Sequence, residues 1–289
     1  MSTQTNADER RSTVIRTAWG FFANSIVAAA LGVVFARIIE QFGIAVWGAI
    51  VGREPVLTHV VTYFRADGSA GSDIAFLGGP LAAILGGVFF LLIYPGAKDR
   101  SVGKLTVLWT VLFCFRAGFV DILTVPFSEE SNTARALATI DLPDGLDVII
   151  ATAGGLGLVL IAVAAAPAFL GFSRHLSEVN TPRERFRYVA SIAMVPAITG
   201  PLLAMLFFVP DQKTGFLASL PFVGLFVVIT LLAAPQTKHF LAPQLAEERT
   251  LSWGLVVGFF VVFLATRYGL EPGLAIPPWD DGFQWAFRP

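Results

Sequence analysis

The residues best placed to do chemistry are charged side chains inside an apolar segment. Arg116 lies near the middle of Leu105–Pro126, and Asp121 follows five residues later. Charged groups inside a membrane are costly, so they mark either a functional site or a buried ion pair. The two residues do not share a face of a straight helix well, but the long arginine could reach Asp121 or Glu40. We therefore expect a structural ion pair or a site for a substrate, a lipid headgroup or a proton.

Ligands for a metal ion or a haem are sparse in this sequence. The histidines are His59, His175 and His239, all between apolar segments, and Cys114 is the sole cysteine. No two histidines share a helix face, which argues against bis-histidine haem ligation in the bilayer and against a paired-histidine zinc site. We therefore predict that the chain binds no metal ion and no other cofactor.

Seven long apolar segments must position these residues. Of the 289 residues, 55% are hydrophobic and 14% are charged, and the mean hydropathy is +0.70. A hydrocarbon core about 30 Å thick needs about 20 apolar residues of helix. We therefore predict an all-α integral membrane protein, with a single membrane domain over residues 17–266. The predicted spans are Thr17–Ala36, Ile74–Tyr94, Leu105–Pro126, Gly145–Phe172, Val189–Pro210, Leu217–Pro235 and Leu251–Thr266.

Basic residues outside the spans predict the orientation of the chain. With the amino terminus in the cytoplasm, twelve Lys and Arg residues fall on the cytoplasmic side and seven on the opposite side. This asymmetry follows the positive-inside rule. We expect a multi-pass protein of a bacterial inner membrane, with polar residues 1–16 in the cytoplasm and the tail, residues 267–289, outside. The last span is short and could be tilted or interfacial.

The segments between the spans give further expectations. Ile38–Gly52 is apolar but contains Glu40 and Gln41, which predicts a re-entrant or interfacial segment. Pro55–Phe64 is rich in Val and Thr and predicts a short β-hairpin in the first outer loop. Ser173–Arg187 is basic and predicts an amphipathic helix at the headgroups. The tail is rich in Pro and aromatic residues, and we weigh an aromatic belt on the outer leaflet against a strap that docks another membrane subunit.

Small residues recur every four positions on the first two spans, which is the spacing that lets helices pack closely in lipid. The first face has Asn24, Ala28, Gly32 and Ala36, and the second has Gly79, Ala83 and Gly87. We expect the glycines and Ala83 at helix contacts. The expected partners are membrane lipids and other membrane subunits, bound through such faces and through the tail, but not nucleic acid.

The order of these features resembles the site-2 protease family of intramembrane zinc metallopeptidases, over residues 17–165. A first helix, a hairpin and then Leu77-Gly-Gly-Pro-Leu-Ala-Ala83 opening a second helix carry the resemblance. In that family a His-Glu-x-x-His run on the first core helix and a later Asp bind the zinc ion. The resemblance therefore implies an intramembrane peptidase fold.

The catalytic positions of that family are not present in this chain. Asn24, Ser25 and Ala28 lie where the two histidines and the glutamate would be required, and Thr133 lies in one of two stretches near the third ligand, the other being Asp144–Asp147. Without imidazole ligands no zinc ion is held to activate water. The resemblance thus implies a pseudoenzyme that retains the fold without the peptidase activity.

Our leading hypothesis is a non-catalytic protein, a structural or accessory subunit of a larger membrane complex with a site-2-protease-like core. The alternative is a small-molecule or lipid transporter that uses Arg116 and Asp121. Pro196 and Gly200-Pro201 are expected to break the fifth span, and broken helices often line transport sites. A lipid-modifying enzyme is a third class, but no nucleophile or base stands out for it.

Overall fold

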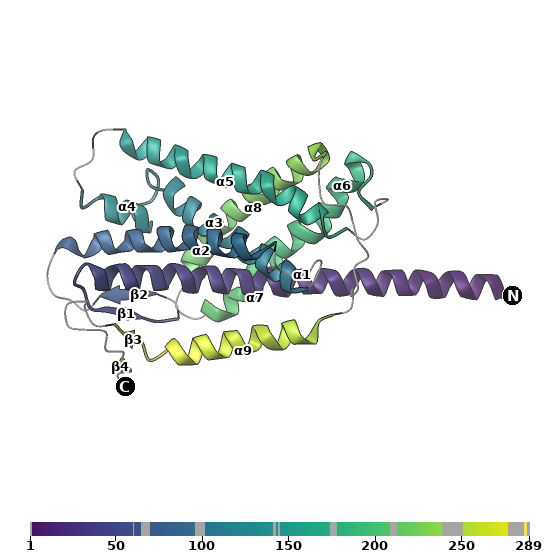
Figure 1. The fold of residues 1–289 in the computed structure, drawn as a ribbon, viewed down its shortest axis with the longest axis horizontal. Helices are drawn as coiled ribbons and strands as arrows, with labels where there is room; N and C mark the ends of the chain where they lie inside the picture. The colour runs from purple at the N-terminus through teal and green to yellow at the C-terminus, as the bar shows by residue number, and fades with distance from the viewer. Residues whose placement is uncertain are drawn as a thin grey trace.

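Long helices dominate the computed structural model of this chain (Figure 1). The structure describes residues 2–59, 61–64, 70–95, 102–140, 143, 145–173, 178–208, 213–238, 251–276 and 286–287. The long helices are α1 (Ser2–Ile50), α2 (Gly78–Ile93), α3 (Val102–Leu123), α5 (Leu146–Leu170), α7 (Val195–Phe208), α8 (Lys213–Ala233) and α9 (Trp253–Leu270). The shorter elements are η1 (Ala70–Leu77), α4 (Asn132–Leu137), α6 (Pro182–Val189), the π-helix η3 (Ala190–Met194) and η4 (Ala234–Gln236).

The predicted class, an all-α multi-pass membrane protein, is confirmed, but seven equal spans are not. Within the described residues, six helical runs are long and apolar enough to cross a membrane. They are Trp19–Ile50, Ile74–Ile93, Val102–Leu123, Leu146–Leu170, Pro182–Leu206 and Trp253–Leu270. The remaining predicted span contains a shorter apolar helical run, Pro221–Gln236.

Helix α1 is longer than the sequence predicts at both ends. It begins at Ser2, so the polar amino-terminal segment is helical and continuous with the first span. The re-entrant segment predicted for Ile38–Gly52 is wrong, because the same helix continues to Ile50. Its end is set by Gly52, whose φ of +77° is the left-handed conformation of a helix-terminating glycine. The N–H of Arg53 then donates to the Gly48 carbonyl oxygen at 2.9 Å.

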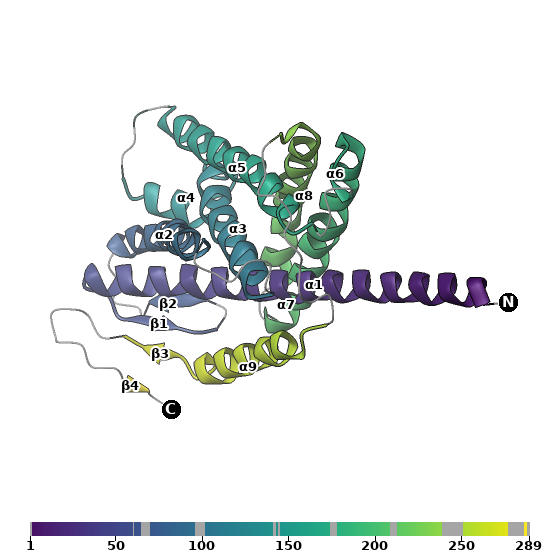
Figure 2. The ribbon, with the colours of Figure 1, turned by 45° about the vertical axis from the view of Figure 1, so that its right-hand side comes forward.

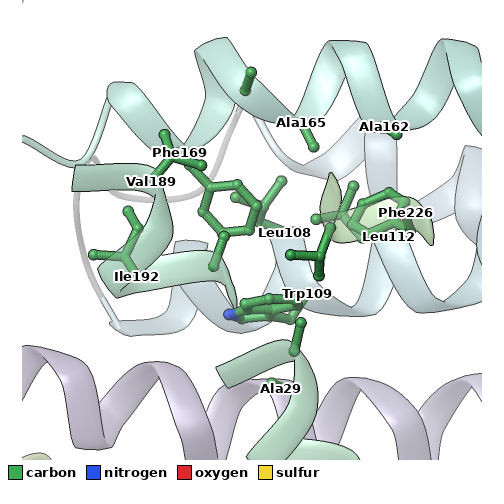
Figure 3. Packing of buried hydrophobic residues seen from close by; sticks show 14 of the residues in the cluster. Ala29, Leu108, Trp109, Leu112, Ala162, Ala165, Phe169, Val189, Ile192 and Phe226 are labelled. Atoms are coloured by element: carbon green, nitrogen blue, oxygen red, sulfur yellow. The ribbon is translucent and has the colours of Figure 1, made fainter. Parts of the chain in front are cut away.

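The other helices are arranged around α1 (Figures 1 and 2). Helices α2, α3, α7 and α9 each pack against α1, α5 packs against α3, and α8 packs against α5. The main core lies between α3, α5, α7 and α8, with Trp109 at its centre (Figure 3). The Trp109 ring lies 5.1 Å from the ring of Phe169 and 5.6 Å from that of Phe113, measured between centroids.

Small residues mark where these helices approach most closely. A Cβ added at Gly32 would lie 2.8 Å from the backbone carbonyl carbon of Trp109, so α1 and α3 are in backbone contact there. A Cβ at Gly87 would lie 2.9 Å from the Phe115 ring, and one at Gly79 would lie 3.1 Å from Ile44. Ala83 is fully buried. The small residues singled out from the sequence therefore all lie inside the protein.

The predicted β-hairpin is present and is part of a larger sheet. Strands β1 (Pro55–Leu57) and β2 (Thr62–Phe64) pair antiparallel, and β1 also pairs antiparallel with β3 (Leu274–Ala275). Strand β4 (Ala286–Phe287) completes the order β2-β1-β3-β4. The described parts of the tail thus pair with the protein's own hairpin, while residues 277–285 lie outside the described residues.

The predicted irregularity of the fifth span is present before Pro196 but not at Pro201. Helix α7 begins at Val195, next to Pro196, and runs through Pro201 without interruption. The irregularity lies just before it, where the π-helix η3 joins α6 to α7. The amphipathic helix predicted near the headgroups is α6, although residues 174–177 of that loop lie outside the described residues.

Candidate functional site

The first polar site joins α1, α3 and α4 and is called the carboxylate cluster here. It consists of Arg37, Glu40, Asp121, Asn132 and Thr133. The Asp121 carboxylate accepts hydrogen bonds from the backbone N–H groups of Asn132 at 2.9 Å and Thr133 at 2.8 Å, and from the Thr133 hydroxyl. These N–H groups belong to the first turn of α4, which has no helical acceptors of its own. Asp121 therefore fastens α4 to the end of α3.

Glu40 brings α1 into the same cluster. Its carboxylate accepts from the Arg37 guanidinium at 3.0 Å and from the Asn132 side-chain amide at 2.8 Å. Arg37 and Glu40 are three residues apart and so lie on one face of α1. Because a carboxylate only accepts, Asn132 must present its NH₂ group to Glu40. Asn132 thus bridges two acids, one through its backbone and one through its side chain.

Arg116 lies close to the carboxylate cluster, on α3. Glu40 is close enough to exert a Coulombic attraction on it. The Arg116 side chain lines a cavity of about 10 Å³, and its guanidinium carbon lies 5.9 Å from the centroid of the Phe113 ring. The rest of the wall is apolar and comes from α3, α7 and α8: Trp109, Leu112, Phe113, Ala197, Val223 and Phe226.

The second polar site is called the Ser25 junction and consists of Asn24, Ser25, Trp109, Ile192 and Ser252. The Ser25 hydroxyl accepts from the Trp109 indole N–H at 3.0 Å and donates to the Ile192 carbonyl oxygen at 2.9 Å. The Asn24 side-chain oxygen accepts from the Ser252 backbone N–H at 2.8 Å. Asn24 and Ser25 are fully buried. Adjacent residues of α1 thus hold α3, η3 and the start of α9.

The Ile192 carbonyl lies in the π-helix η3, shortly before a proline. An α-helical arrangement would give it the N–H of residue 196, four positions on, but residue 196 is a proline without an N–H. A buried carbonyl without a donor costs about 1–3 kcal/mol. The Ser25 hydroxyl supplies a donor from another helix at this irregular turn.

The positions that stand for the peptidase residues do not form one site. Asn24 and Ser25 belong to the Ser25 junction and Ala28 lies in the main core, whereas Thr133 belongs to the carboxylate cluster. Ser25 is the α1 residue of one site and Glu40 is an α1 residue of the other. At 1.5 Å per residue, these two residues are roughly 22 Å apart along the helix axis. The structure therefore places the two sets of positions at different depths.

The chemistry open to these groups follows from their bonds. The Ser25 proton is directed at a backbone carbonyl, and the Asp121 oxygens accept from the backbone and from Thr133. Both arrangements hold structure together rather than present a reactive atom to a substrate. Among the described residues, no three His, Cys, Asp or Glu side chains gather in a way that could hold a metal ion. His175 and His239 lie outside those residues, and His59 is buried beside the hairpin.

Five participants were missed from the sequence: Arg37, Asn132, Trp109, Ile192 and Ser252. The spacing of Arg37 and Glu40 is a local signal for a helical pair and could have been recognised. Ser131-Asn-Thr is typical of a helix start, and Ser131 indeed accepts from the Ala134 N–H at 3.0 Å. The bond from Ser252 to Asn24 joins residues 228 positions apart, so no local pattern predicts it.

Comparison with known proteins adds no assignment to these observations. No protein-family model, no curated protein and no solved structure matches this chain.

Proposed function

We propose that this chain is a non-catalytic integral membrane protein, a structural or accessory subunit of a larger membrane assembly. The observation that carries the proposal is the use made of polar residues within the spans. Ser25, Asp121 and Glu40 each bond to an element other than their own helix. These polar side chains form hydrogen bonds that fix the helices relative to one another. This use of polar groups is expected of a rigid scaffold.

Helix α9 supports the subunit role because it is fixed in place although little of it is buried. Its start is held by the bond from Ser252 to Asn24, and the chain just after it pairs with β1. Phe259 is its one buried side chain in the described part of the chain. The opposite face, with Val257 and Val261, is exposed. A helix tethered at both ends presents a defined apolar face, which suits lateral contact with another membrane protein.

Photo-crosslinking in the native membrane tests this proposal. A photoreactive amino acid placed at Val257 or Val261 should give an adduct of one discrete mass, containing one other membrane protein in fixed stoichiometry. The same amino acid at Phe259, which faces α1, is the matched control and should give only intramolecular adducts. Lipid adducts alone at both exposed positions, with the protein purifying by itself, would refute the subunit role.

One observation favours transport as a second candidate function. Arg116 lines a cavity between α3, α7 and α8, and an arginine at such depth is often part of a solute pathway. The cavity of about 10 Å³ is far smaller than a metabolite, so this function requires the helices to separate. A purified chain that binds a solute, and loses that binding in Arg116→Leu while staying folded, would put transport ahead of the subunit role.

Kinship with site-2 proteases stays a prediction from the sequence, and the proposed role does not depend on it. Ser25 on α1 and Thr133 on α4 belong to different polar sites. Metal analysis of the purified chain tests whether it is a zinc peptidase. About one tightly bound zinc ion per chain together with peptidase activity would show that it is.

A further inference from the structure

Helix α6 is held in a fixed orientation at one end of the bundle. Its first turn has a capping box, in which the Glu184 N–H donates to the Thr181 hydroxyl oxygen and the Thr181 N–H donates to the Glu184 carboxylate. Arg185 anchors it further by donating to the carbonyl oxygens of Val179 at 2.8 Å, Asn180 at 3.2 Å and Thr237. Val189 at its end is fully buried. These contacts fix which side chains of α6 face outward.

The outward face of α6 combines two arginines with an aromatic ring. Arg183, Phe186 and Arg187 are exposed and, at spacings of three and four residues, lie on one side of the helix. Phe186 keeps 42% of its surface exposed. Lys238, also exposed, follows directly after Thr237, the residue that Arg185 bonds. Among the described residues from 178 to 189 the acids are Glu178 and Glu184, and Glu184 is engaged in the capping box and attracted by Arg187.

The position of α6 places this face where a membrane surface would be. The π-helix that follows α6 meets α1 at Ser25, and Phe172 meets Phe21 with ring centroids 6.1 Å apart. These contacts lie near the beginning of the first apolar segment predicted from the sequence, Thr17–Ala36. Figure 1 shows α6 at the same end of the bundle as the end of α5 and the end of α8. The face therefore lies at the boundary between the apolar spans and water.

We propose that this face of α6 binds the headgroups of anionic phospholipids. An aromatic ring between two guanidinium groups matches the interface, because the ring enters the acyl region while each guanidinium binds a phosphate through two parallel hydrogen bonds. The proposal is independent of whether the chain is a subunit or a carrier, since it concerns a surface that neither polar site uses.

Lipid selectivity of the full-length chain tests the proposal. The protein is reconstituted in phosphatidylcholine bilayers, and spin-labelled phosphatidylglycerol or phosphatidylcholine reports the relative association constant for the two headgroups. The wild-type chain should prefer phosphatidylglycerol. R183Q/R187Q should lose about fivefold of that preference per arginine, as expected for basic residues at a membrane surface. F186A should reduce the association of both lipids rather than the ratio between them.

Two further variants keep the result unambiguous. R183K/R187K retains the charge and should keep most of the preference, which separates the arginines' charge from a loss of folding. R53Q removes one arginine charge beside β1 and should leave the ratio unchanged. A wild-type chain without preference for phosphatidylglycerol, or an R183Q/R187Q chain with the wild-type ratio and an unchanged unfolding temperature, would overturn the proposal. A loss in R53Q equal to the loss per arginine in R183Q/R187Q would show that overall charge alone sets the ratio, which would overturn it as well.

Discussion

The carboxylate cluster and the Ser25 junction both hold helices together, but they do so with different chemical groups. Both join α1 to α3 and to a segment distant in the sequence, and both satisfy backbone groups that their own helix leaves without a partner. The carboxylate cluster does so with charged acceptors at the start of α4, whereas the Ser25 junction uses one neutral hydroxyl next to a proline. A carboxylate accepts hydrogen bonds from several donors at once, whereas the Ser25 hydroxyl accepts one hydrogen bond and donates one. The charged site should therefore contribute more stability and depend on more partners.

Replacing Asp121 should have the largest effect. Asp121→Leu leaves the N–H groups of Asn132 and Thr133 without their acceptor, and hydrogen bonds to a charged group contribute about 1.5–3 kcal/mol each. We expect the free energy of unfolding in a denaturing-detergent titration to fall by about 3 kcal/mol or more. Asp121→Asn is the control, because it keeps one acceptor oxygen and should lose less. Equal stability of the Asp121→Leu variant and the wild type would show that the carboxylate cluster does not contribute more stability than the Ser25 junction.

Ser25→Ala should come next, with a loss of about 2 kcal/mol, because it leaves the Trp109 N–H and the Ile192 carbonyl without their partner. A double-mutant cycle with Pro196→Ala sharpens this prediction. Restoring the N–H at residue 196 lets η3 form an α-helix in which Ile192 has a helical donor, so Ser25→Ala should cost about 1 kcal/mol less in that background. Simple additivity of the two changes would mean that the hydroxyl does not compensate for the proline.

Asn132→Ala should have a smaller effect than either, about 1 kcal/mol. It removes the side-chain bond to Glu40 but keeps the backbone N–H that donates to Asp121. Thermal unfolding followed by size-exclusion chromatography should show a modest fall in midpoint. A loss as large as that of Asp121→Leu would show that the two acids act through Asn132 as one unit.

Arg37→Gln should have the smallest effect, about 0.5 kcal/mol. Its ion pair with Glu40 spans three residues of one helix, and a quarter of the arginine side chain (25%) is exposed. The same titration at low and high salt isolates the contribution of the Arg37–Glu40 ion pair to stability, because a partly exposed ion pair weakens as the salt concentration increases. A large and salt-independent loss would place Arg37 among the buried supports of the cluster.

The sequence predicted the structure correctly where the governing rule depends on residues close together in the chain. Apolar length predicts the membrane class, Val and Thr before a turn predict the hairpin, and the small residues at Gly32 and Gly87 predict close helix packing. It was a poor guide where a polar residue has a distant partner. Glu40 and Gln41 suggested an interface, but they bond to Asn132 and Thr62, so α1 continues through them. The Ser25 junction has the same origin, with a partner 167 positions away.

The sheet at one end of the bundle has a consequence for how the chain is made. Leu57 pairs with Thr62 on one side and with Leu274 on the other, so one edge of the hairpin receives its partner only from the segment that follows α9. During synthesis the hairpin leaves the ribosome before that segment, and its open edge stays available to other strands until α9 is inserted. Closure of the sheet therefore requires that α9 has been inserted. Truncation before β3 would leave that edge open as a signal that quality control can recognise.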